Sequence, residues 1–154
     1  MAHRTGTHTD DEIRQLNSLL RGEISAVETY DIALKKLDDT TTAEATQLRS
    51  IAQEHGEAAQ TLREMIREAG GQPETSSGAW GAWAKTVSSV ASIFGDTSAL
   101  KSLKEGEEHG AKDYRDALDD LDPDCANVVS GTLLPANERH IQVIDSLIDR
   151  VRAR

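Results

Sequence analysis

The chain has 154 residues, enough for one domain with a sizeable hydrophobic core. Its formal net charge of −10 opposes non-specific nucleic-acid binding, because phosphates would be repelled. Cys125 is the single cysteine, which excludes an internal disulfide and favours the reducing cytoplasm. The sequence shows no apolar run of membrane-spanning length. Residues 1–9 are polar, lack the apolar core of a signal peptide and are expected to be frayed.

The first predicted helix contains an acid in the middle of its apolar face. Thr9 and Glu12 predict a capping box at its start, and residues 38–40 mark its end. Glu23 shares one face with Tyr30, at the three- and four-residue spacing of a helical stripe. The stripe consists of Ile13, Leu16, Leu19, Leu20, Glu23, Val27, Tyr30, Leu34 and Leu37.

The second predicted helix carries a histidine at the centre of its apolar face. Thr41 and Glu44 predict its capping box, and Gly70 with Gly71 predicts its end. The stripe consists of Leu48, Ile51, Ala52, His55, Ala58, Ala59, Leu62, Met65 and Ile66. His55 therefore points into the bundle if the apolar residues do.

A long crossover, residues 71–96, follows the second helix. Residues 72–78 are predicted to form a loop, and Trp80, Trp83 and Phe94 then follow helical spacing, which predicts a short amphipathic helix. Its aromatic face either covers the side of the bundle or forms an exposed patch that pairs two subunits into a dimer.

The third and fourth helices are predicted over 98–120 and about 125–153. Pro135 lies inside the fourth helix and predicts a kink or a break there. The third stripe consists of Leu100, Leu103, Glu107, Ala111, Tyr114, Leu118 and Leu121. The fourth consists of Leu133, Asn137, His140, Ile141, Ile144, Leu147, Ile148 and Val151.

The predicted fold is all-α, and the lengths of the connections predict how its four helices are arranged. Helices one and two are joined tightly, as are helices three and four, which gives two antiparallel hairpins. A four-helix bundle with one long crossover is the arrangement of ferritin-like folds. We therefore expect a single ferritin-like four-helix-bundle domain over residues 10–153, with the crossover helix at its side.

An internal repeat relates the first and third helices. A shift of 84 residues places Glu23 on Glu107 and Tyr30 on Tyr114, and it also aligns the surrounding leucines. Each helix thus has an inward Glu followed two turns later by an inward Tyr. The repeat copies the polar residues of the stripe together with the apolar ones.

These polar residues form a band inside the predicted bundle. Isolated buried carboxylates are costly, and a divalent ion is one reason for several acids and imidazoles to share a core. Carboxylate and imidazole ligands suit iron, manganese or zinc. The predicted ligands are Glu23, Glu54, His55, Glu107, Glu138 and His140, with Glu54 and Glu138 at the seams between helices. Tyr30, Tyr114 and Asn137 are predicted to orient ligands through hydrogen bonds. The alternative is a metal-free polar network that fixes helix register.

The segments "LNSLLRGEISAVETYDIAL", "IAQEHGEAAQTLREMIREAGGQP", "WGAWAKTV" and "LKEGEEHGAKDYRDAL" together resemble an uncharacterised family of small bacterial four-helix-bundle proteins in the ferritin-like superfamily. The resemblance implies a ferritin-like fold and descent from di-metal carboxylate proteins, and it supplies no function. The superfamily pattern has Glu on helices one and three, which Glu23 and Glu107 match. It has Glu-x-x-His on helices two and four, where this chain has Glu54 beside His55 and Asn137-x-x-His140. One ion, an unequal pair of ions and an empty site all stay open.

Two functions therefore compete at this level. The first is a protein that binds one or two iron or manganese ions, without an organic cofactor, and that oxidises Fe(II), consumes peroxide or buffers metal. The second is a non-catalytic, stress-associated or interaction bundle. The sequence contains no Gly-rich phosphate loop, no nucleophile elbow and no cysteine cluster, which argues against nucleotide, hydrolase and iron–sulfur chemistry.

Overall fold

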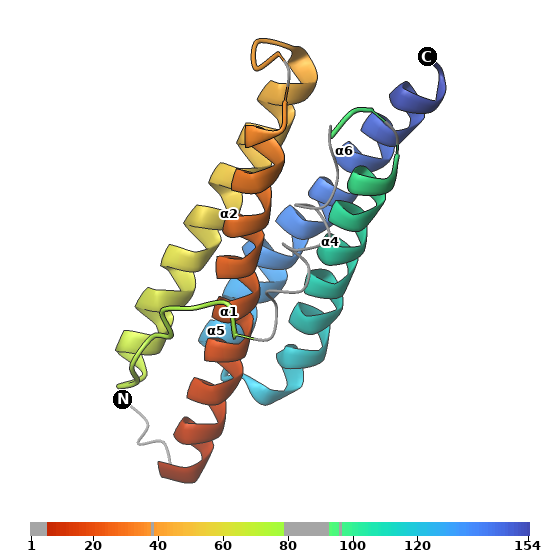
Figure 1. The fold of residues 1–154 in the computed structure, drawn as a ribbon. Helices are drawn as coiled ribbons and strands as arrows, with labels where there is room; N and C mark the ends of the chain where they lie inside the picture. The colour runs from red at the N-terminus through yellow and green to blue at the C-terminus, as the bar shows by residue number, and fades with distance from the viewer. Residues whose placement is uncertain (1–5, 38, 79–92, 96) are drawn as a thin grey trace.

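The structure, a computed structural model, describes residues 6–37, 39–78, 93–95 and 97–154. The described residues form four long helices and no strand, which confirms the predicted all-α bundle (Figure 1). The first hairpin consists of α1 (Gly6–Lys35) and α2 (Ala43–Glu68), and the second of α4 (Ser98–Ala117) and α6 (Leu134–Arg152). A 3₁₀ turn, η2 (Leu118–Asp120), ends α4. The start of α1 and the end of α6 lie at opposite ends of the bundle (Figure 1).

The ends of α2 differ in detail from the prediction. Thr42, not Thr41, is the N-cap, because its side chain accepts a hydrogen bond from the amide of Ala45. The Thr41 hydroxyl instead donates to Asp39 in the preceding turn. At the C-terminus, Gly70 has a positive φ of 86°, and the amide of Gly71 donates to the carbonyl of Ile66. This is a Schellman end, which confirms the predicted stop.

The start of α1 lies earlier than predicted. The helix begins at Gly6, so Thr9 lies within it and does not cap it. Glu12, the other half of the predicted capping box, is fully buried. It faces Asp122 and Cys125 of the turn before the last helix, with oxygen and sulfur atoms within 4.8 Å of one another. The prediction was wrong because Glu12 makes a tertiary contact that sequence spacing does not reveal.

The predicted irregularity near Pro135 is confirmed. The last helix begins as α5 (Pro123–Val128), passes through a π-helical segment, η3 (Val129–Leu133), and continues as α6. Pro135 lies in the first turn of α6, directly after the π segment. Proline has no amide hydrogen to donate to the preceding turn, so a change of helical register there avoids an unmade α-helical bond. The start of α5 is capped by Asp122, which accepts from the amide of Cys125.

The core consists of two apolar clusters, one on each side of the central polar residues. One lies toward the α2 C-terminus and includes Leu16, Leu20, Leu62, Ile66, Leu121 and Val129. The other lies toward the turn between α1 and α2 and includes Leu48, Ile51, Leu100, Leu103, Ile144 and Leu147. Both clusters keep water away from the middle of the bundle, where the polar residues lie.

The start of the crossover runs along α1. Asn17 is buried and binds this segment at two points, donating to the carbonyl of Gln72 and accepting from the amide of Glu74. The predicted crossover helix, with Trp80 and Trp83, lies outside the described residues. Phe94 is half-buried and packs against the second apolar cluster. No helix in the described part of the chain has the length and apolar character that a membrane span needs.

Candidate metal centre

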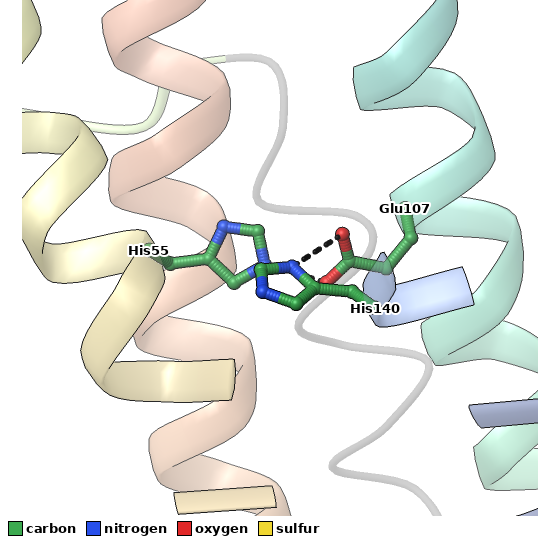
Figure 2. A group of neighbouring side chains, drawn as sticks. All are labelled: His55, Glu107 and His140. Carbon is green, nitrogen blue, oxygen red and sulfur yellow. Dashed lines mark hydrogen bonds and ion pairs between the residues drawn. The ribbon is translucent and has the colours of Figure 1, made fainter. Parts of the chain in front are cut away.

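Each long helix contributes one buried Glu or His to the middle of the bundle. Glu23 comes from α1, His55 from α2, Glu107 from α4 and His140 from α6. Their exposed fractions are 5%, 3%, 1% and 3%, so the predicted band is inside the bundle. Figure 2 shows the side chains of His55, Glu107 and His140 pointing toward one another from three different helices.

Glu107 is the hub of this cluster. One carboxylate oxygen lies 2.5 Å from His55 Nε2 and accepts from the Tyr30 hydroxyl at 2.8 Å. The other accepts from Asn137 Nδ2 at 2.7 Å and lies 3.3 Å from His140 Nδ1. Both oxygens of this buried acid are therefore fully engaged, which offsets the cost of burying it.

His55 lies between the two repeated acids. Its Nδ1 is 2.6 Å from Glu23, while its Nε2 faces Glu107. Its ring stacks on the ring of Tyr30, with centroids 5.4 Å apart. A carboxylate can only accept a hydrogen bond, so in the metal-free protein both ring nitrogens carry protons. Burial opposes this charge, but the nearby carboxylates of Glu107 and Glu23 outweigh it and raise the pKa of His55 well above its ordinary value.

His140 joins the cluster to the edge of the bundle. Its Nε2 lies 2.8 Å from Glu54, a residue of α2 whose side chain is 34% exposed. The guanidinium of Arg139 donates to the other oxygen of Glu54 at 3.1 Å. Partial burial opposes ionisation of Glu54, but the hydrogen bonds from His140 and Arg139 lower its pKa overall. Sequence spacing placed Glu54 at a seam between helices, and the structure turns it toward His140.

The two tyrosines cross between the halves of the repeat. Tyr30 of α1 donates to Glu107 of α4, and Tyr114 of α4 donates to Glu23 of α1 at 2.6 Å. Burial, followed by the charge of the adjacent carboxylate, raises the pKa of both phenols well above 10.0. Each hydroxyl therefore keeps its proton and acts as a donor that fixes the orientation of a carboxylate.

The pKa of Glu107 falls from 4.5 to about 2. Burial alone would raise it, but the charge of His55 and the hydrogen bonds from His140 and His55 act in the opposite direction and are stronger together. Glu107 is therefore an anion at neutral pH, in the protonation state that a metal ligand requires.

The remaining predicted residues lie as follows. Asn137 is buried and bonds to Glu107, as an orienting residue would. A Cβ atom at Gly110 would lie 3.1 Å from Asn137 Nδ2, so this glycine allows α6 to bring Asn137 against α4. Glu138, predicted as a ligand, is exposed on α6. Arg139 was not predicted from the sequence, because its spacing is that of a solvated position.

A small cavity of about 20 Å³ reaches the centre between α1 and α4. Its wall includes small residues, Gly22, Ala26 and Gly106, and the buried residues Glu23 and His55. This volume holds about one water molecule. The cavity therefore has room for one ligand of that size.

The donor atoms of His55, Glu107 and His140 lie within 4.8 Å of one another. Metal–nitrogen and metal–oxygen bonds of about 2.0–2.2 Å place neighbouring donor atoms of one ion about 3–3.5 Å apart, so small shifts of these side chains would let them share one ion. Two imidazoles and one carboxylate are a donor set typical of Fe(II), and they also suit manganese or zinc. The three residues therefore fit a transition-metal ion.

Comparisons with known proteins agree with this architecture. Residues 11–120 match the family described as "Domain of unknown function (DUF2383)". The chain belongs to this family. Its fold is similar to that of the ferritin like, diiron-carboxylate proteins from Bacillus anthracis str. Ames, with a TM-score of 0.62, 19% identity, and coverage of 99% of this chain and 98% of that chain. This likeness confirms the predicted ferritin-like fold. None of the curated proteins matches this chain.

Proposed function

We propose that this member of the family is a transition-metal-binding protein whose ion, iron or manganese, lies in the middle of the bundle. The observation that carries the proposal is the convergence of His55, Glu107 and His140 in a buried site with donor atoms within 4.8 Å. The similarity to ferritin like, diiron-carboxylate proteins supports it. A bound iron or manganese would supply Lewis acidity or a change of redox state. Fe(II) oxidation or peroxide consumption is then the activity to assay.

The experiment is metal analysis of the purified full chain after anaerobic loading with Fe(II) and desalting. We expect stoichiometric iron in the wild type and none in a His55→Gln, His140→Gln double variant. His109 is an exposed histidine of α4 that lies outside the cluster, so His109→Gln is the matched control and should load like the wild type. Absence of iron from the wild type, or equal loading of the double variant, would overturn the proposal.

The alternative function is a metal-free bundle whose polar centre only stabilises the fold. The observation in its favour is that the carboxylate oxygens of Glu23 and Glu107 and both ring nitrogens of His55 already have hydrogen-bond partners. The two functions predict different effects of added metal on the thermal stability of the protein. A ligand that binds only the folded state at 100 times its dissociation constant adds about 2.7 kcal/mol, whereas the alternative predicts no change on adding metal.

We further propose that the protein is a homodimer in the cytoplasm. The sequence has a single cysteine, Cys125, which supports a reducing compartment, and the aromatic residues predicted in the crossover support self-association. Light scattering tests the dimer directly. Trp80→Ala combined with Trp83→Ala should halve the mass of a dimer, and an unchanged mass would exclude this surface.

A further inference from the structure

We propose that the centre binds a single metal ion through His55, Glu107 and His140, and that Glu23 and Glu54 orient the imidazoles without binding metal. This inference deepens the proposed metal-binding function and rests on it. It differs from the two-ion arrangement implied by the ferritin-like fold.

Each imidazole faces Glu107 with one nitrogen and an outer carboxylate with the other. His55 presents Nε2 to Glu107 at 2.5 Å and Nδ1 to Glu23 at 2.6 Å. His140 presents Nδ1 to Glu107 at 3.3 Å and Nε2 to Glu54 at 2.8 Å. Histidines that bind metal generally donate their second N–H to a carboxylate or carbonyl, which fixes the tautomer and the ring plane. Both histidines have this arrangement, with the metal-facing nitrogens converging on one side of Glu107.

The two outer carboxylates are held in orienting positions by further donors. Glu23 accepts from the Tyr114 hydroxyl at 2.6 Å through the oxygen that does not contact His55. Glu54 accepts from Arg139 at 3.1 Å through the oxygen that does not contact His140. Each acid therefore has one oxygen on a histidine and the other on a donor outside the centre. These contacts hold each acid against the outer nitrogen of its histidine.

The bridging carboxylates of a two-ion site are missing. Ferritin-like dinuclear bundles take a Glu from each of two helices and a Glu-x-x-His motif from each of the other two. The residue three positions before His55 is Ala52, which has no donor atom, and the residue three positions before His140 is Asn137. Asn137 uses its amide nitrogen as a donor to Glu107. Among the described residues, Glu107 is thus the single carboxylate that faces both imidazoles.

Two observations leave room for one ion with a free position. Two histidines and one carboxylate form the facial set of mononuclear iron sites, which keep positions open for other ligands. The cavity of about 20 Å³ between α1 and α4 touches His55 and Asn137, next to this set. A water-sized ligand therefore fits beside His55, the proposed metal ligand that lines this cavity.

The test uses Mn(II) alone as the probe, on full-length protein stripped with chelator. Bound Mn(II) per chain is counted by elemental analysis, and electron paramagnetic resonance distinguishes an isolated ion from an exchange-coupled pair. We expect one ion per chain with the spectrum of an isolated ion. Two ions, or a coupled spectrum, would overturn this inference and leave the proposed function standing. No bound ion, with Fe(II) also absent, would overturn both.

Matched variants separate ligands from orienting residues. Glu107→Gln should abolish Mn(II) binding, whereas Glu23→Gln and Glu54→Gln should keep one ion with an affinity about 10–100-fold lower. Tyr114→Phe and Arg139→Gln loosen the same two acids without removing a buried carboxylate, so they give the same answer if an acid variant does not fold. Glu138→Gln is the exposed control and should bind like the wild type. Complete loss of the ion in Glu23→Gln or Glu54→Gln, with circular dichroism unchanged, would contradict the orienting role.

Discussion

The first helices of the two hairpins present the same polar residues to the centre, and they do so reciprocally. Glu23 of α1 accepts from Tyr114 of α4, and Glu107 of α4 accepts from Tyr30 of α1. Both acids also contact His55. This half of the structure keeps the symmetry of the internal repeat.

The second helices of the two hairpins, α2 and α6, break that symmetry. Three positions before the inward histidine, α2 has Ala52 and α6 has Asn137. One position before it, α2 has Glu54 and α6 has Arg139, and these two residues form an ion pair across the bundle. The difference shows why the two repeated acids are unequal. Glu107 has the amide of Asn137 and both imidazoles around it, whereas Glu23 has one imidazole and one phenol.

The largest effect should come from removing each repeated acid in turn. Glu107→Ala leaves a protonated His55 without its main counter-charge in a buried site, and breaking such a pair costs about 3–5 kcal/mol of unfolding free energy. Glu23→Ala removes two hydrogen bonds and should cost less than Glu107→Ala. Urea unfolding of the metal-free variants measures both values. Equal losses would show that the two halves are equivalent.

Restoring the missing carboxylates should make α2 and α6 alike at the centre. Ala52→Glu combined with Asn137→Glu rebuilds Glu-x-x-His before both His55 and His140. We expect this variant to bind a second Mn(II) ion and to give a coupled spectrum. Ala52→Gln with Asn137→Gln is the control of matched size and should stay at one ion. A second ion in that control would show that carboxylates at these positions do not set the count.

The two reciprocal Tyr–Glu hydrogen bonds between α1 and α4 can be tested by removing each tyrosine hydroxyl. Tyr30→Phe and Tyr114→Phe each remove one hydrogen bond to a buried carboxylate, which costs about 1.5–3 kcal/mol. We expect the two losses to agree more closely than those of the two acids. Urea unfolding of the metal-free proteins gives the values, and a large difference between the tyrosines would contradict the reciprocal arrangement.

The pH dependence of metal-free stability tests the pairing of His55 with Glu107. The raised pKa of His55 gives a stabilisation that is complete below its ordinary pKa of 6.5 and is lost as pH rises through the folded-state pKa. The lowered pKa of Glu107 gives a second stabilisation, which is complete above pH 4.5 and is lost as the pH falls toward about 2. Both are complete between pH 4.5 and 6.5. Urea midpoints of wild type and Glu107→Gln should differ most in this window, and a constant difference at all pH values would contradict the pairing.

The sequence predicted the centre well where the side chains follow helical periodicity. Glu23, His55, Glu107 and His140 lie on apolar stripes, and an inward stripe position is buried whatever the neighbouring helix does. The internal repeat also predicted that the two acids occupy matching positions of α1 and α4, each followed two turns later by a tyrosine. Periodicity therefore identified which residues lie in the centre.

Sequence spacing could not predict which side chains contact one another between helices. Glu54 lies beside a stripe, and only the position of His140 on a distant helix decides that it turns inward. Glu12 was assigned to a cap because its burial depends on the turn that precedes α5. Arg139 carries no periodic signal, since its partner is on another helix. Each of these requires the packing of helices that are far apart in sequence.

The most direct test of the central claim is anomalous diffraction from crystals of the Mn(II)-loaded protein. We predict one anomalous peak per chain, bonded to His55, Glu107 and His140, with Glu23 and Glu54 on the outer nitrogens of the histidines. Two peaks, a peak bonded to Glu23 or Glu54, or no peak between the helices would contradict it.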